Sequence, residues 1–173
     1  MNRRSTQTVA AGVLAILLTA AGVAVAGADR GGDDFDARLS GYEETPMTIS
    51  TVASGRFEAD VDRGSQRIDY ELSYSGLEGN VLFAHIHFGR RATSGGVSAF
   101  LCGGGGKPPC PQSGSVEGTI VPADVVGPVG QGIEPGAFAE LVRAMRVGAT
   151  YANVHSSKWP GGEIRGQIRG DDD

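Results

Sequence analysis

Hydrophobic and polar residues alternate along much of this chain, and the alternation predicts short β-strands. Residues 55–62 and 68–74 show it most clearly, because every second position in each run is apolar or glycine. A period of two is typical of strands that have one face in a core and one face in water. Residues 63–66 lie between the runs, contain glycine and serine, and predict a hairpin turn. We therefore expect the two runs to pair as antiparallel strands.

Shorter runs predict six further strands, separated by turns that are rich in glycine and proline. These strands are expected at residues 36–40, 81–88, 97–101, 115–121, 149–155 and 163–168. One segment has a helical period instead, with Phe138, Leu141, Val142 and Met145 forming a single apolar stripe. Gly148 follows this stripe and is suited to end the helix. About eight strands and one helix predict an all-β fold, a sandwich or barrel with one crossover α-helix.

The chain begins with a segment unlike the rest. An arginine pair precedes an apolar run from Val9 to Val25, and the run closes on small residues. This order is typical of a secretory signal peptide, and it predicts that residues 1–26 are removed after Ala26 or, as a second choice, after Ala28. An uncleaved membrane anchor is the alternative, because the run approaches the length that spans a bilayer. The predicted product is a secreted, extracellular protein or one that is retained in a periplasm or cell wall.

Charge and composition limit the classes of partner that the exported protein can bind, and they indicate how its chain is divided. The chain of 173 residues carries 15 basic and 20 acidic side chains, and no basic stripe is visible. This balance argues against nucleic acid as a partner and, once the signal is removed, against a membrane. Residues 27–34 are rich in glycine and aspartate and predict a flexible leader, and residues 170–173 predict an acidic tail. Between them, residues 35–169 are expected to form one domain.

The two cysteines enclose a short glycine-rich loop. Cys102 and Cys110 are separated by the residues Gly-Gly-Gly-Gly-Lys-Pro-Pro. In an exported chain this spacing predicts a disulfide bond that closes the loop. A metal or redox role would need a tighter spacing of the two thiols, or a histidine beside them, and the sequence has neither.

Three histidines carry the strongest chemical signal. His85 and His87 lie two apart in a predicted strand, so their side chains point to the same face. His155 lies in another predicted strand, and the three imidazoles meet if those strands are neighbours. A same-face pair plus a third histidine is the ligand set of several zinc and copper sites. The sequence therefore predicts a candidate site for Cu or Zn.

A hydrogen-bonded polar cluster is the alternative interpretation of the same residues. Asn153 shares the side of His155, and the last predicted strand places Glu163 and Arg165 together on one face. In this alternative the imidazoles bond to Glu163, Asn153 or the backbone, and Arg165 favours it because a nearby cation disfavours a metal ion. The sequence contains no G-x-S-x-G elbow and no other catalytic constellation, so no catalytic residue and no reaction is nominated.

Four ordered segments resemble the CHRD domain, a family that also occurs in microbial exported proteins. They are residues 39–46 (LSGYEETP), 84–89 (AHIHFG), 151–155 (YANVH) and 162–168 (GEIRGQI). The resemblance covers about residues 35–169 and implies an immunoglobulin-like β-sandwich or barrel, but no settled activity. Two features depart from the family pattern: Met47 replaces the second proline of the first motif, and the loop between the cysteines looks like an insertion.

The family motifs include most of the polar face described above. The matching positions are Glu44, His85, His87, Asn153, His155, Glu163 and Arg165. The strand with two histidines also looks like the copper strand of Cu/Zn superoxide dismutases. That enzyme needs further histidine and aspartate ligands, and three histidines are too few for its complete site.

Two functions follow as hypotheses. The first is a non-enzymatic exported module that binds an extracellular protein or glycan, or supports an extracellular assembly. The second is a metal-binding protein that uses His85, His87 and His155 to bind Cu or Zn. Metal analysis separates the two hypotheses.

Overall fold

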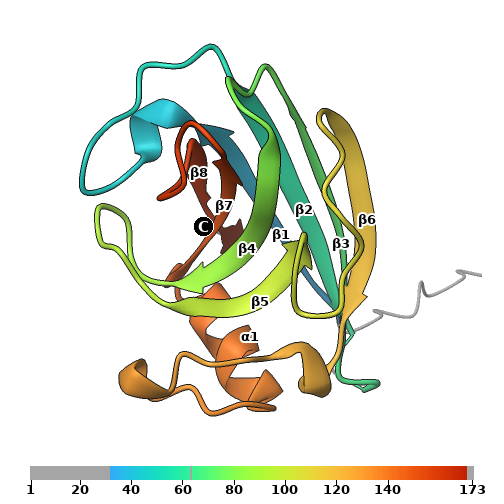
Figure 1. Ribbon diagram of the computed structural model, residues 1–173. Coiled ribbons are helices and arrows are strands. Elements are labelled where there is room, and N and C mark those ends of the chain that lie inside the picture. The colour runs from blue at the N-terminus through green and yellow to red at the C-terminus, as the bar shows by residue number, and fades with distance from the viewer. Residues whose placement is uncertain (1–31, 63, 171–173) are drawn as a thin grey trace, which may run out of the picture.

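The computed structural model describes residues 32–62 and 64–170, and these residues form a nearly closed β-barrel with one α-helix (Figure 1). The strands are β1 (Gly32–Ser40), β2 (Ser54–Asp62), β3 (Arg67–Ser75), β4 (Val81–Phe88), β5 (Val97–Cys102), β6 (Gly114–Ile120), β7 (Thr150–Ser156), β8 (Ile164–Gln167) and β9 (Arg169–Gly170). The helix is α1 (Phe138–Arg146), and the short 3-10 turns are η1 (Gly41–Glu43), η2 (Pro122–Asp124) and η3 (Val129–Gln131). The predicted fold class is confirmed; the last predicted strand, 163–168, corresponds to β8, and β9 is a further short strand beyond it.

The strands form one antiparallel sheet that curls on itself. Their order is β5-β4-β7-β8-β1-β2-β3-β6, and β9 pairs with β1. The predicted hairpin is present, with Val61 of β2 opposite Ile68 of β3. The first and last strands of this order, β5 and β6, also contact each other. Beside them the Tyr70 hydroxyl of β3 donates a hydrogen bond of 2.7 Å to the Leu101 carbonyl of β5.

The core lies inside the curled sheet, where alternate side chains of every long strand meet. Phe57 and Leu72 come from the predicted hairpin, and Ile86 and Ile164 come from the opposite wall of the barrel. All four side chains are fully buried. The alternation seen in the sequence is therefore the alternation between this core and the outside of the barrel.

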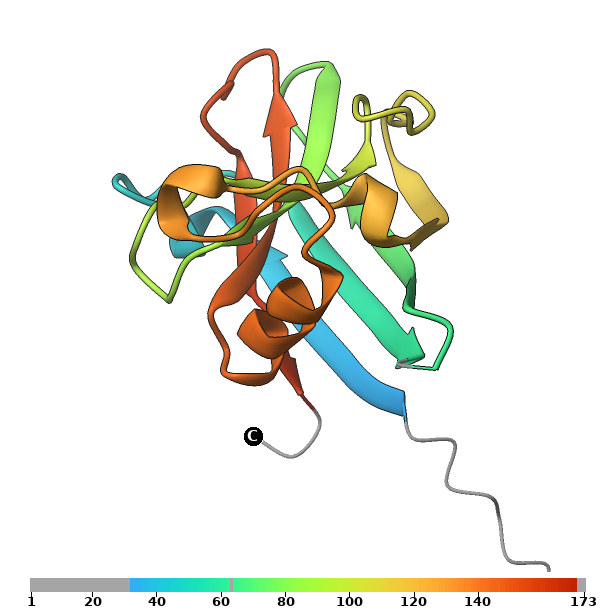
Figure 2. The same cartoon turned by 90° about the horizontal axis from the view of Figure 1, so that it is seen from below.

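Helix α1 closes one end of the barrel, as the views in Figures 1 and 2 show. Phe138, Leu141, Val142 and Met145 are all buried, which confirms the predicted apolar stripe. Gly148 follows the helix with a φ of +58°, and its backbone N–H bonds to the Met145 carbonyl. A residue without a Cβ atom is favoured in this left-handed conformation.

The first strand begins earlier than the sequence indicates. β1 starts at Gly32, so residues 32–34 of the predicted leader belong to the sheet, where Asp34 lies opposite Asp60. The predicted signal peptide, residues 1–26, lies outside the described residues. Within the part of the chain that the structure describes, no helix has the length and apolar character needed to cross a bilayer.

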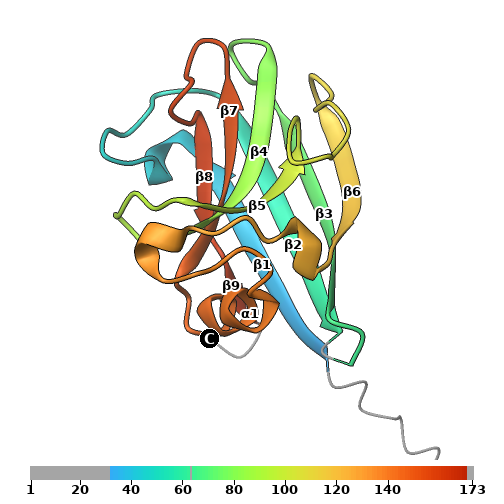
Figure 3. The same cartoon turned by 60° about the horizontal axis from the view of Figure 1, so that its bottom comes forward.

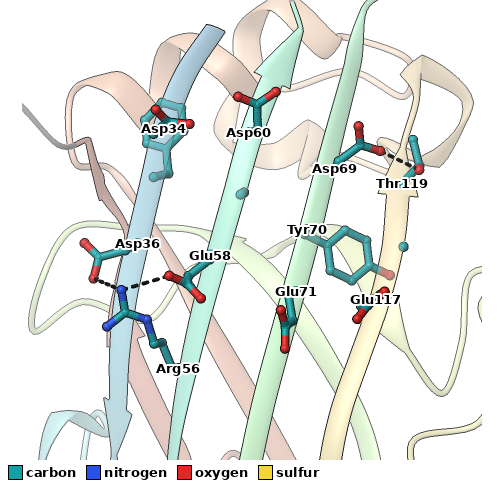
Figure 4. A pocket seen from close by; sticks show the side chains of 13 residues that line it. Asp34, Asp36, Arg56, Glu58, Asp60, Asp69, Tyr70, Glu71, Glu117 and Thr119 are labelled. Carbon is teal, nitrogen blue, oxygen red and sulfur yellow. Dashed lines mark hydrogen bonds and ion pairs between the residues drawn. The ribbon is translucent and has the colours of Figure 1, made fainter.

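The outer face of β1, β2, β3 and β6 is acidic (Figure 4). A shallow hollow runs over these four strands and is lined by seven carboxylates and by Arg56. The carboxylates belong to Asp34, Asp36, Glu58, Asp60, Asp69, Glu71 and Glu117. We call this surface the acidic face. Its side chains are exposed or half-exposed, because nothing in the described part of the chain folds over them.

Candidate metal centre

The three strands that carry the predicted site residues are neighbours in the sheet (Figure 3). β7 lies between β4 and β8, with Asn153 between His85 and Arg165 in the register. His155 lies opposite Phe83 of β4. Because side chains alternate along each strand, these residues all point away from the barrel core. The sequence predicts a shared polar face on the condition that these strands are neighbours. The structure meets this condition.

This outer face of β4, β7 and β8 is covered, and we call it the covered face. The loop 41–53, the loop 89–96 and the loop 157–163 fold over it, and every residue of β7 is buried as a result. The buried residues include all seven motif positions, which are Glu44, His85, His87, Asn153, His155, Glu163 and Arg165. The sequence predicts a polar face but does not predict that loops shield it from water.

Arg165 ties two of the covering loops to the sheet. Its Nη1 donates a 2.5 Å hydrogen bond to the Thr45 hydroxyl, and its Nη2 donates to the Arg90 carbonyl at 3.1 Å. Next to it, the Asn153 amide donates to the Glu44 carboxylate at 2.6 Å. Burial raises the pKa of Glu44 to about 7, while the Asn153 hydrogen bond and the Arg165 charge act in the opposite direction.

Glu163 anchors a different set of loops. Its carboxylate is fully buried and accepts hydrogen bonds from the Thr51 hydroxyl (2.9 Å), the Glu78 backbone N–H (2.9 Å) and the Ser156 hydroxyl (2.5 Å). These partners differ from the imidazoles and Arg165 that the sequence suggests. Glu163 is therefore a structural group that joins three segments far apart in the sequence.

The three imidazoles converge on one point. Each of His85, His87 and His155 offers one ring nitrogen, and the three nitrogens lie within 4.8 Å of one another. The shortest separation is 3.2 Å, between His85 Nδ1 and His155 Nε2. The rings are only 6–8% exposed. Among residues 32–62 and 64–170, no carboxylate or thiolate joins this group.

Backbone carbonyls fix which nitrogen of two rings carries the proton. His87 Nδ1 lies 3.0 Å from the Gly95 carbonyl, and His155 Nδ1 lies 3.0 Å from the Pro160 carbonyl. A carbonyl oxygen only accepts, so each Nδ1 is the donor and each neutral ring has its lone pair on Nε2. Metal-binding histidines are held by the same kind of outer hydrogen bond. The Nε2 atoms of His85 and His87 are buried and have no partner among the described residues.

Burial also keeps the rings neutral. Desolvation, helped by the two neighbouring imidazoles, lowers the pKa of His85 to about 3. Desolvation lowers the pKa of His87 to about 4, although its bond to the Gly95 carbonyl acts in the opposite direction. Burial lowers the pKa of His155 as well. Each ring therefore keeps one unprotonated nitrogen at neutral pH, which a metal ion requires of its ligands.

Aromatic side chains surround the imidazoles. Phe83 stacks on His85 with 5.7 Å between ring centroids, and Phe100 meets His85 edge-on at 4.5 Å. Tyr151 stacks on His87 at 4.8 Å, with the Arg165 guanidinium 3.5 Å from its ring centroid. Two groups this close cannot share one side of the ring, so Tyr151 separates Arg165 from His87. In the sequence, Arg165 argues against a metal ion, but the structure places the Tyr151 ring between Arg165 and His87.

The disulfide loop packs against Phe100, one of the aromatic side chains that surround the imidazoles. Cys102 and Cys110 are bonded, as the sequence predicts. The loop backbone packs directly on Phe100, because a Cβ atom added at Gly104 or at Gly105 would lie 2.6 Å from a carbon of that ring. The glycine tract therefore presses Phe100 against His85. Sequence reasoning missed this role, since it treated the tract only as a loop.

Other residues of the site were also missed. Thr51 and Glu78 lie in loops without a motif, and Ser156 directly follows the last of the three motif residues 153–155 without belonging to a motif itself. The available signal for Tyr151 was its position two residues before Asn153, on the same face of the strand. The sequence offers no signal for the carbonyls of Gly95 and Pro160, because any residue supplies a carbonyl.

Comparisons with known proteins give one match. A family model described as the CHRD domain matches residues 35–168, which include the barrel from β1 to β8 and the whole histidine cluster. No curated protein and no solved structure matches the chain.

Proposed function

We propose that this chain, which belongs to the CHRD domain family, is an exported, non-enzymatic binding module that binds a copper or zinc ion through His85, His87 and His155. The observation that carries the proposal is the convergence of three ring nitrogens from buried, neutral imidazoles, together with the unpartnered Nε2 of His87. Export is supported by the N-terminal signal pattern and by the disulfide bond, since disulfides persist in oxidising compartments.

One pair of the nitrogens already has the spacing of metal ligands. Ligands at 2.0–2.1 Å in a tetrahedral arrangement lie about 3.3 Å apart. The 3.2 Å between His85 Nδ1 and His155 Nε2 is close to that value. In a purely structural cluster, the buried Nε2 of His87 has no partner, which costs about 1–3 kcal/mol. An ion that accepts the lone pair of this nitrogen removes that cost.

Metal analysis of purified residues 27–173 tests the proposal. We expect one equivalent of copper or zinc per chain, measured by elemental analysis and by calorimetric titration of the metal-free protein. His87→Gln keeps a polar side chain but removes a ligand nitrogen, and we expect it to weaken binding at least tenfold. Glu117→Gln removes a carboxylate from the acidic face and serves as the matched control, which leaves binding unchanged. No uptake at micromolar metal, or equal loss in both variants, contradicts the proposal.

An extracellular protein or glycan is the second candidate ligand of the module. The loop 41–53 exposes three large apolar side chains, with Tyr42 at 70%, Met47 at 71% and Val52 at 89% exposed. Exposed apolar groups of this size favour contact with a macromolecule. Binding to a panel of extracellular glycans and matrix proteins, compared between the native chain and Tyr42→Ser, tests this candidate. Equal binding by both proteins rejects a role for this loop.

A further inference from the structure

We propose that the histidine centre is selective for monovalent copper, Cu(I), over Zn²⁺ and Cu²⁺. This inference rests on the proposed metal site and names the ion that the site prefers. Three observations carry it: the charge of the ligands, their number, and the apolar shell around them.

The charge of the site suits a monovalent ion. All three ligands are neutral imidazoles, and no carboxylate or thiolate among the described residues joins them. The two buried carboxylates of the described chain bond to other groups, Glu44 to Asn153 and Glu163 to Thr51 and Ser156. The cost of moving an ion out of water rises with the square of its charge, so a dication costs about four times as much as a monocation. An uncompensated dication is therefore strongly disfavoured here.

The number of ligands points to the same ion. Zn²⁺ in proteins is almost always four-coordinate, and Cu²⁺ prefers a tetragonal arrangement of nitrogen and oxygen ligands. The described chain supplies three nitrogens, and rings that are only 6–8% exposed leave little access for solvent to complete either set. Cu(I) has the same filled d shell as Zn²⁺ but only a single charge, so fewer ligands satisfy it and three imidazoles complete its set.

The shell around the ligands favours the lower charge as well. Phe83, Phe100 and Tyr151 pack against the imidazoles and provide an apolar surrounding. An apolar shell around a metal lowers the local dielectric and thereby tunes its redox potential. Beyond Tyr151 lies the cationic guanidinium of Arg165, which adds to the penalty for a dication.

Competition titrations of metal-free residues 27–173 test this selectivity. Under anaerobic conditions the protein competes with a chromogenic Cu(I) chelator, and in parallel experiments with indicators for Zn²⁺ and Cu²⁺. We expect one Cu(I) per chain, bound at least 100-fold more tightly than either divalent ion. If Zn²⁺ or Cu²⁺ binds as tightly as Cu(I), this inference fails while the proposed metal site stands. If no ion binds, both fail.

A pair of variants at Phe83 tests the charge argument directly. This side chain is 36% exposed and contacts the rings of both His85 and His155. Phe83→Glu brings a carboxylate to the cluster, and we expect it to reduce the preference for Cu(I) over Zn²⁺ at least tenfold. Phe83→Gln has the same size without the charge and should leave the preference within about threefold of the native value. An equal change in both variants overturns the role of charge.

Discussion

The acidic face and the covered face are the two outer surfaces of one sheet, and their sequences show similar alternation. On the acidic face, the outward residues of β2 are exposed. On the covered face, the outward residues of β7 are buried as well as the core-facing ones, because three loops fold over that strand. The comparison shows that alternation determines which side chains face the core. Whether the other side chains meet water depends on the loops.

The two faces also differ in their electrostatics. On the acidic face, a small burial effect together with the hydrogen bond and charge of Asp34 raises the pKa of Asp60 above its usual value. Ion pairs such as Arg56–Glu58, at 2.9 Å, partly balance the carboxylates. On the covered face, desolvation dominates and lowers the pKa of the histidines. Solvent screens the first set of charges and not the second.

Removal of one carboxylate from each face gives the largest expected contrast. Glu163→Ala removes the acceptor of one buried donor, the Ser156 hydroxyl, and of two partly buried donors, the Thr51 hydroxyl and the Glu78 N–H, which costs about 3 kcal/mol of unfolding free energy. Glu117→Ala on the acidic face should change it by no more than about 0.5 kcal/mol. Urea unfolding of both variants measures the contrast. Equal destabilisation would show that the covering loops do not depend on Glu163.

Acid is expected to destabilise the metal-free protein through the covered face. His87 has a pKa of 6.5 when unfolded and about 4 when folded, so below pH 6.5 the unfolded chain binds a proton that the folded chain does not. Its contribution to stability is complete above pH 6.5 and falls by about 1.4 kcal/mol per pH unit until about pH 4.

The matched variant for this effect is His87→Gln. It removes the titrating group, so the unfolded chain should take up about one proton fewer, relative to the folded chain, between pH 6.5 and pH 4. The dependence of the unfolding free energy on pH becomes less steep accordingly. Thermal unfolding of the metal-free proteins across this range provides the measurement. An unchanged slope would mean that His87 is not neutral in the folded protein.

Substitution of two glycines in the disulfide loop distinguishes the effect of backbone strain from the effect of contact with Phe100, one of the aromatic side chains around the imidazoles. Gly105 and Gly106 both have positive φ, at +58° and +79°, but a Cβ atom at Gly105 would strike Phe100 and one at Gly106 meets nothing within 4 Å. Gly105→Ala should therefore weaken metal binding about tenfold, through displacement of Phe100 from His85. Gly106→Ala should cost about 1 kcal/mol of stability and leave affinity unchanged. Equal metal affinity in the two variants would show that the position of Phe100 does not affect metal binding.

The smallest expected effect belongs to the acidic face. Because the pKa of Asp60 is raised in the folded protein, its ionisation opposes folding as the pH rises above 3.8. Asp60→Asn should stabilise the protein at neutral pH by up to about 0.5 kcal/mol, and less at high salt. Unfolding at two salt concentrations checks this, and a loss of stability would contradict it.

The sequence predicts the fold and part of the site for the same reason. Period-two patterns and the i, i+2 spacing of His85 and His87 are local, and strand geometry alone converts them into a shared face. The position of Glu163 on that face was also local information. Its partners Thr51 and Glu78 were not, since they lie 112 and 85 residues away and reach it only when separate loops dock. The packing of the glycine tract on Phe100 is equally invisible to any periodic pattern.

The contact between the edge strands β5 and β6, which we call the seam, affects whether the protein associates with other chains. An exposed strand edge is a template for pairing with another chain, and open sheets must protect theirs against aggregation. Here both edges meet at one seam, where carbonyls are already occupied: Ser98 by the Val126 N–H, Leu101 by the Tyr70 hydroxyl and Thr119 by the Lys107 ammonium. Lys107 belongs to the disulfide-closed loop, so the same loop that supports the histidine shell also shields an edge. The sheet therefore resists addition of a further strand from another chain.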